Sequence, residues 1–148
     1  MGPLRYIVNH FHPLLNSACR LSDQAGKRIH HLKIGEMGEK MAKLRLYADG
    51  RKILYTNFRD PNGRGGEIDI VARDGATLSF VEVKTRRKRA TSRPLEAVDK
   101  KKQQLIKLGA RAWLNLLKDD EIMWRFDVVE VELTEGEKPE ITVIEGAF

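Results

Sequence analysis

The chain has 148 residues, 41% of them hydrophobic and 32% charged, with a net charge of +6 and a pI near 9.5. This length predicts one domain, or one domain with a tail, and the composition excludes an intrinsically disordered chain. A single cysteine, Cys19, excludes a disulfide scaffold, and no apolar run approaches the ~18 residues of a membrane helix. We therefore expect a cytoplasmic protein with no membrane partner.

The positive charge is concentrated in one segment. Residues 84–111 contain eleven basic and two acidic residues, a net of +9, so the rest of the chain is negative. This distribution is typical of nucleic-acid binding, and we expect residues 86–94 to form a basic loop in which Arg86 to Arg89 are mobile. The residues predicted to contact nucleic acid are Arg86, Arg87, Lys88, Arg89, Arg93, Lys100 and Lys101.

Residues 1–33 are predicted to be an N-terminal extension, partly helical or disordered, with a short helix after Pro13. The segment contains all four histidines, but no cysteine pair accompanies them, so a zinc site is disfavoured. Cys19 lacks any context that would make it a nucleophile. Residues 34–148 are then the functional domain.

The domain begins with a predicted helix over 34–48, on which Gly38 and Ala42 would let another element approach closely. Strands are predicted over 52–58, 67–72 and 77–85. These three strands can form a meander.

A second helix is predicted over 95–117, with Gly109 on its apolar stripe. A strand over 125–133 and another over 141–144 follow it. This order of elements predicts an α/β fold with a small mixed central sheet flanked by helices.

The hairpin of the second and third strands gathers charged side chains. A two-residue turn at Asp74-Gly75 would pair residue 73 with 76 and place Asp69 diagonal to Glu82. Glu67 would then lie opposite Glu82, and Lys84 would share the same face because side chains alternate along a strand. A shift of one residue would separate them, so the prediction depends on the turn.

Three carboxylates on one strand pair repel each other unless a cation lies between them. Mg²⁺ and Mn²⁺ prefer oxygen ligands, and Lys84 could orient or deprotonate a water molecule or neutralise a phosphorane-like transition state. Together these groups suit hydrolysis of a phosphodiester. The alternative is that the same residues are solvated charges on an exposed strand face.

Three further polar residues have two readings each. Lys102 interrupts the apolar stripe, so it either extends its ammonium to solvent or reaches toward the site with help from Gln103. Glu67 either supports the metal ligands or hydrogen-bonds the preceding loop. Glu39 could simply pair with Lys43 on a solvated helix face.

Several motifs in this order resemble the YraN family, a widespread bacterial family, over residues 35–148. They are Gly35-x-x-Gly38-Glu39-x-x-Ala42, then Gly50, Ile53, Asn57 and Arg59, Gly66-Glu67-Ile68-Asp69-Ile70, Phe80-Val81-Glu82-Val83-Lys84-Thr85-Arg86, Glu96-Ala97-Val98, Lys102-Gln103, Arg125-Phe126-Asp127-Val128-Val129 and Ala147-Phe148. The sequence differs in its long extension before Gly35, its Pro61–Gly65 loop and Ile68 in place of a proline before Asp69.

This resemblance implies the restriction-endonuclease-like fold and a PD-(D/E)xK site similar to that of archaeal Holliday-junction resolvases. It implies that Asp69, Glu82 and Lys84 are catalytic and that Asp69, Glu82 and Glu39 hold Mg²⁺ or Mn²⁺. The implied function is a structure-selective endonuclease acting on DNA. Full resemblance to the junction resolvases would imply a homodimer, because symmetric cutting of two strands needs two sites. The alternative is a non-catalytic nucleic-acid-binding module in a repair or uptake complex, and RNA remains open as the substrate.

Overall fold

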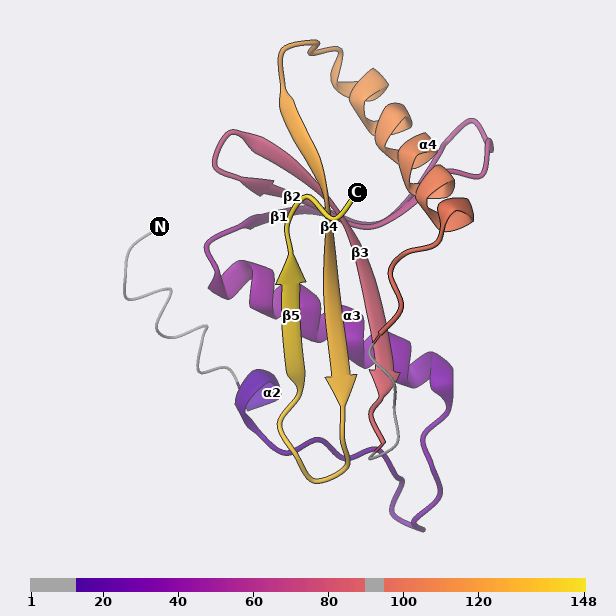
Figure 1. The fold of residues 1–148 in the computed structure, drawn as a ribbon, viewed down its shortest axis with the longest axis vertical. Helices are drawn as coiled ribbons and strands as arrows, with labels where there is room; N and C mark the ends of the chain where they lie inside the picture. The colour runs from indigo at the N-terminus through magenta and orange to yellow at the C-terminus, as the bar shows by residue number, and fades with distance from the viewer. Residues whose placement is uncertain (1–12, 90–94) are drawn as a thin grey trace. The chain divides into compact units, whose positions relative to one another are not determined.

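The computed structural model describes residues 13–89 and 95–148. Two longer helices and five strands make up most of it, together with one short helix (Figure 1). In chain order the elements are α2 (Pro13–Asn16), α3 (His31–Ala48), β1 (Lys52–Arg59), β2 (Glu67–Asp74), β3 (Thr77–Arg87), α4 (Lys100–Leu117), β4 (Met123–Leu133) and β5 (Glu140–Ile144).

The five strands form one mixed sheet in the order β1-β2-β3-β4-β5. The first three strands are an antiparallel meander, as the sequence predicts. β4 runs in the same direction as β3, after the crossover through α4, and β5 runs in the opposite direction (Figure 1). The predicted mixed α/β sheet with flanking helices is therefore confirmed at this level.

The β2–β3 register differs from the predicted one by two residues. Asp74 pairs with Thr77, so the two-residue loop is Gly75-Ala76 rather than Asp74-Gly75. Gly75 takes the left-handed backbone conformation that such a turn needs, with φ of 59°. Because the shift is even, side chains keep their predicted faces, and continuing this register by one residue from the Ile70–Val81 pair brings Asp69 opposite Glu82.

The chain forms two compact units, each containing part of β3 and of β4. The first unit comprises Met1–Gly50, Val83–Pro94 and Val129–Val143, as far as these residues are described. In it α3 packs closely on β3, because a Cβ at Gly38 would lie 1.8 Å from Oγ1 of Thr85. The close approach predicted from Gly38 is thus confirmed.

The described part of the N-terminal segment packs within this first unit. Cys19 and Leu21 are buried, and the Cys19 backbone donates a hydrogen bond of 2.7 Å to the Glu137 carbonyl. α3 begins at His31, three residues earlier than predicted, because the His30 side chain accepts a hydrogen bond from the Leu32 backbone and caps the helix. The predicted helix after Pro13 is α2.

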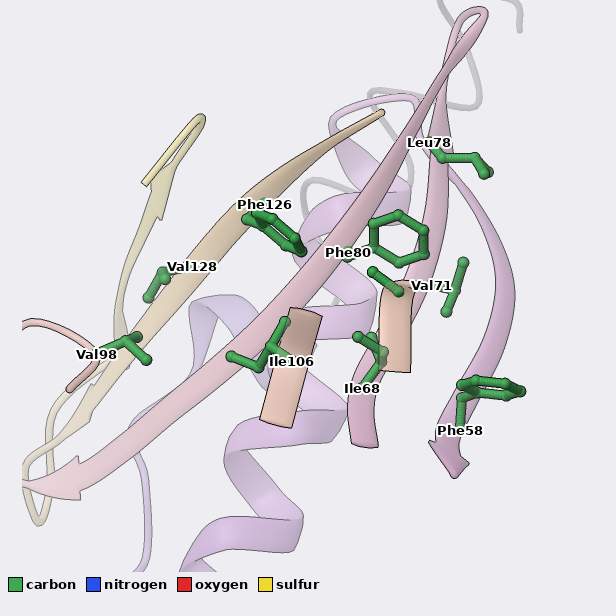
Figure 2. Close-up of a cluster of buried hydrophobic side chains, with 10 residues drawn as sticks. Phe58, Ile68, Val71, Leu78, Phe80, Val98, Ile106, Phe126 and Val128 are labelled. Atoms are coloured by element: carbon green, nitrogen blue, oxygen red, sulfur yellow. The ribbon is translucent and has the colours of Figure 1, made fainter. Parts of the chain in front are cut away.

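The second unit comprises Arg51–Glu82, Leu95–Val128 and Ile144–Phe148, and it has an apolar core of its own. Figure 2 shows Ile106 of α4 among buried side chains of the strands. This burial fixes α4 against β2, since each buried aliphatic or aromatic side chain contributes roughly 1.5–3 kcal/mol. The core residues are Phe58, Ile68, Val71, Leu78, Phe80, Val98, Ile106, Ala110, Phe126 and Val128.

α4 starts at Lys100, five residues later than predicted. The reason is Asp99, whose carboxylate accepts a 2.8 Å hydrogen bond from the Lys102 backbone and caps the helix. Farther along, a Cβ at Gly66 would lie 2.5 Å from the Gly109 nitrogen, so the helix touches the start of β2 backbone to backbone. The predicted role of Gly109 in close packing is confirmed.

Candidate metal centre

Asp69 on β2 and Glu82 on β3 form the centre of the candidate site. The Glu82 side chain is buried, and it shares a hydrogen bond with Asp69. Burial raises the pKa of Glu82 to about 8, with repulsion from Asp69 adding to it and the Lys102 ammonium opposing it. Two acidic groups in contact, one of them holding a proton, form a site that a cation would stabilise.

Lys102 supplies positive charge to this pair from α4. Its Nζ hydrogen-bonds Oε1 of Glu67 and lies 3.7 Å from Oε1 of Glu82. Burial lowers the pKa of Lys102, but the Glu67 hydrogen bond and the charges of Glu82 and Asp69 outweigh it and raise the pKa. The structure therefore favours the reading in which this lysine reaches toward the carboxylates.

Glu67 is held between two cations. Its hydrogen bond to Lys102 is the main cause that lowers its pKa, and Arg59 Nη1 lies 3.1 Å from its Oε2. Glu67 therefore contacts both the helix and the end of β1. Arg59 is one of the positions that carry the resemblance to the YraN family, but its contact with Glu67 was not predicted from the sequence.

Gln103 does not join this cluster through its side-chain amide. The amide donates a 2.9 Å hydrogen bond to the Val98 carbonyl, so it secures the segment that leads into α4. It thus supports Lys102 only by fixing the helix start.

The residues present fit a hard divalent cation through two carboxylates. Mg²⁺ is commonly held by one or two carboxylates, with water and phosphate oxygens completing its shell. Within residues 13–89 and 95–148 no group of three or more His, Cys, Asp or Glu side chains is arranged to hold a metal. The site therefore offers the pair Asp69 and Glu82, and Glu39 as a third ligand, on α3 in the first unit, stays a prediction.

Lys84 follows Glu82 by two residues in β3. Along a continuous strand this spacing puts both side chains on the same face of the sheet. Lys84 belongs to the first unit and is half-buried. Its catalytic role stays a prediction.

Three residues of the predicted basic loop are instead tied to the protein. Arg86 and Arg87 are the last residues of β3, which runs two residues beyond its predicted end because both side chains find partners there. Arg86 lies 3.0 Å from a carboxylate oxygen of Glu132, and Arg87 donates to the Leu21 and Ile29 carbonyls. Lys88 lies 3.0 Å from Glu140. A mobile loop beginning at Arg86 is therefore wrong, and the expected nucleic-acid contacts of these residues stay predictions.

The remaining basic residues of the prediction have different settings. Lys100 and Lys101 are exposed in the first turn of α4, and Arg89 is exposed after β3. Arg93 lies outside the described residues. In the described part of the chain, no helix combines the length and apolar character needed to cross a membrane.

Comparison with known proteins identifies the family. The profile of the uncharacterised protein family UPF0102 matches residues 38–131, which include Asp69, Glu82 and Lys84. The chain belongs to UPF0102. This is the YraN family, so the resemblance drawn from the motifs is confirmed.

Curated UPF0102 proteins align with most of this chain. A UPF0102 protein of Trichlorobacter lovleyi is 45% identical over 116 residues, which cover 78% of this chain and 89% of the relative. UPF0102 proteins of Geobacter metallireducens and Geobacter sulfurreducens are 42% and 44% identical, over 81% and 83% of this chain and 95% and 94% of their own lengths. The UPF0102 relatives therefore correspond to this chain over nearly their whole lengths.

Proposed function

We propose that this UPF0102 protein is a metal-dependent phosphodiester hydrolase, a structure-selective endonuclease that acts on DNA and resembles Holliday-junction resolvases. The contact between the Asp69 and Glu82 carboxyl groups supports this proposal most strongly. Glu82 is buried, and a buried carboxylate beside a second one is costly unless it is protonated or neutralised by a cation. We extend the proposal to a restriction-endonuclease-like fold and a cytoplasmic location.

In the proposed reaction Asp69 and Glu82 would hold Mg²⁺ or Mn²⁺, with Glu39 as an additional ligand. Such a cation would polarise the scissile phosphate and stabilise the charge that develops on it. Lys84 would orient the attacking water and take its proton, or neutralise charge on the phosphate as the bond breaks. Lys102 would keep Glu67 ionised and reduce repulsion at Glu82.

The basic residues would hold the nucleic-acid backbone. Phosphate contacts position a polyanion without reading its sequence, which suits a protein that recognises branched structure. Lys100 and Lys101 are exposed on α4, the helix that carries Lys102. A homodimer would place two equivalent sites on the two strands of a junction.

A cleavage assay tests this function. Branched, nicked and linear DNA and an RNA of the same sequence would be incubated with the protein, with and without Mn²⁺. We expect cleavage of branched DNA only with the metal, and its loss in Asp69→Asn and Lys84→Met. A control variant, Asp120→Asn, changes an exposed carboxylate in the turn after α4 and should cleave like the wild type.

One observation favours a second candidate, a nucleic-acid-binding module without catalysis. The Lys102 ammonium already lies against Glu67 and 3.7 Å from Glu82, where it supplies positive charge without a metal. Such a module would bind branched DNA equally well with and without Mn²⁺ and cleave none of the substrates. That result would overturn the nuclease proposal.

A further inference from the structure

A hollow in the second unit lies along α4, on a different flank from Lys102. It is a cavity of about 310 Å³ between α4 and the start of β4, and its lining is mostly apolar. Trp124, Phe126, Leu114 and Ala110 supply the apolar lining. This volume is at the lower end of the range for small-molecule sites, which suits a single planar ring system.

The Trp124 ring is held in place although 46% of the residue is exposed. It packs edge-on against Phe126 with ring centroids 5.3 Å apart, and against Phe80 at 6.3 Å. Phe126 in turn stacks on Phe148 at 4.8 Å. The inner contacts fix the indole, while its outer part borders the cavity and remains accessible.

Positive charge lies beside this aromatic surface. Lys107 and Arg111 also line the cavity, and both are exposed. Within the described residues neither forms an ion pair, and α4 itself has no acidic residue. An apolar protein partner would not require these two unpaired cations, whereas a ligand that carries a phosphate next to an aromatic ring would.

The cations continue along one stripe of α4. Lys107 and Arg111 follow Lys100 by seven and eleven residues, a spacing that puts all three on nearly the same side of a helix with 3.6 residues per turn. Lys100 and Arg111 are thus about 16 Å apart along the axis, which is enough for several nucleotides. The acidic run Asp119-Asp120-Glu121 ends the stripe after α4.

We propose that this cavity binds an unpaired nucleobase, stacked on Trp124, while Lys107 and Arg111 hold the adjoining phosphates of a single-stranded segment. Base stacking on aromatic side chains tolerates any sequence, and a basic groove follows the backbone. The inference rests on the proposed function in taking nucleic acid as the ligand. It adds that the protein binds unpaired nucleotides, as are found at branches and ends.

Tryptophan fluorescence provides the test. In a Trp113→Phe background, Trp124 is the one tryptophan left in the 148-residue sequence, and the titrations would be run in EDTA so that no cleavage occurs. We expect a short oligothymidylate to quench the emission and an abasic oligonucleotide of equal length to bind about tenfold more weakly. Equal affinity for the two oligonucleotides would overturn the proposal.

Variants separate stacking from general electrostatic attraction. By fluorescence anisotropy of a labelled oligothymidylate, Trp124→Leu and the double variant Lys107→Gln, Arg111→Gln should each weaken binding about tenfold. The double variant Lys52→Gln, Arg73→Gln removes two exposed charges from the β1–β2 hairpin and should bind almost as tightly as the wild type. Equal losses in both double variants, or a Trp124→Leu variant that binds normally, would contradict the proposal.

Two results distinguish this inference from the function on which it rests. Asp69→Asn should keep its oligothymidylate affinity in EDTA, so failure of metal binding or cleavage leaves the base-binding cavity intact. Conversely, the protein could cleave DNA with metal and yet bind abasic and normal strands equally. In that case the nuclease proposal stands and the base-binding proposal is wrong. If Trp124→Leu changes only concentration-dependent self-association, the surface joins two copies of the chain and the proposal is wrong.

Discussion

Glu82 is the residue whose ionisation connects the site to stability. Its pKa of about 8 in the folded protein lies above the ordinary value of 4.5, so the folded chain holds a proton that the unfolded chain releases between these values. Stability falls with rising pH wherever the folded state binds more protons. Glu82 therefore contributes stability that is fully present below about pH 4.5 and lost as the pH rises through about 8.

The Glu82→Gln variant tests this linkage. Between pH 5 and pH 8.5, the wild-type free energy of unfolding should fall relative to that of the variant by an amount on the order of 3 kcal/mol. Urea unfolding of both proteins across this range measures the difference. Glu36→Gln, an exposed position on α3, is the control and should show no such trend. A wild-type-to-variant difference that is independent of pH would contradict the account.

Lys102 is the second residue with a specific consequence. Lys102→Met would leave Glu67 without its lysine partner and Glu82 without a nearby cation, so we expect a loss of about 1–3 kcal/mol at pH 7. Mn²⁺ should restore part of this loss, because a bound cation supplies the missing charge. Thermal unfolding with and without Mn²⁺ measures both effects. Lys101→Met is the matched control on the exposed side of α4, and an equal loss there would refute the argument.

At the scale of elements, the placement of α4 on β2 depends on two glycines, Gly66 before β2 and Gly109 in α4. A Cβ at Gly109 would lie 2.9 Å from Cγ1 of Ile68 and 3.0 Å from the Glu67 nitrogen. This contact holds the helix that carries Lys102 against the strand that carries Glu67 and Asp69. Bulk at this position would move the cation and the carboxylates apart.

Gly109→Ala should therefore destabilise the protein by about 1–3 kcal/mol, since overpacking outweighs the gain in helix propensity. Gly35→Ala is a matched control, because Gly35 also lies within a helix and a Cβ there would meet nothing within 4 Å. That control should stabilise by up to about 1 kcal/mol. Chemical denaturation compares the two variants, and equal effects would show that the contact with β2 is unimportant.

The elements also show how far sequence reasoning reaches. Hydrophobic periodicity and turn residues predicted both long helices and all five strands. They misplaced the start of α4, since the signal there is the local cap by Asp99 and not the apolar pattern. They also missed the C-terminal end of β3, where Arg86 and Arg87 are held by partners distant in the sequence.

The candidate site was predicted in composition but not in detail. Strand alternation placed Asp69 and Glu82 on one face, and this survived the error in the turn because the register moved by two residues. The contact of Glu67 with Lys102 could not be predicted in detail, because it depends on how closely α4 approaches β2 through Gly66 and Gly109. Its contact with Arg59 follows instead from the pairing of β1 with β2.

At the scale of the whole molecule, a second and fully satisfied charge network contrasts with the site. Asp127 is fully buried and accepts hydrogen bonds from Arg51 at 3.0 Å, from Arg125 at 2.9 Å and from the Gly146 backbone at 2.9 Å, as well as from Ser79. It joins segments from the start of β1 to the C-terminal turn. Both carboxylate oxygens of Asp127 accept hydrogen bonds from the protein, which indicates a structural role.

Asp127→Asn should cost about 3–5 kcal/mol of unfolding free energy, because two arginines would lose their buried anionic partner. Differential scanning calorimetry would record the lower midpoint. The exposed Asp119→Asn variant is the control and should change stability little. A loss below about 1 kcal/mol for Asp127→Asn would mean that the network is not a stabilising element.

The central claim is that Asp69 and Glu82 bind a hard divalent cation, and calorimetric titration with Mn²⁺ at pH 7 tests it most directly. We predict binding to the wild type, and to the control Glu121→Gln, with release of a proton from Glu82 that is seen as a dependence of the heat on the buffer. Asp69→Asn should abolish the binding. A wild type that binds no Mn²⁺, or an Asp69→Asn variant that binds it undiminished, would contradict the account.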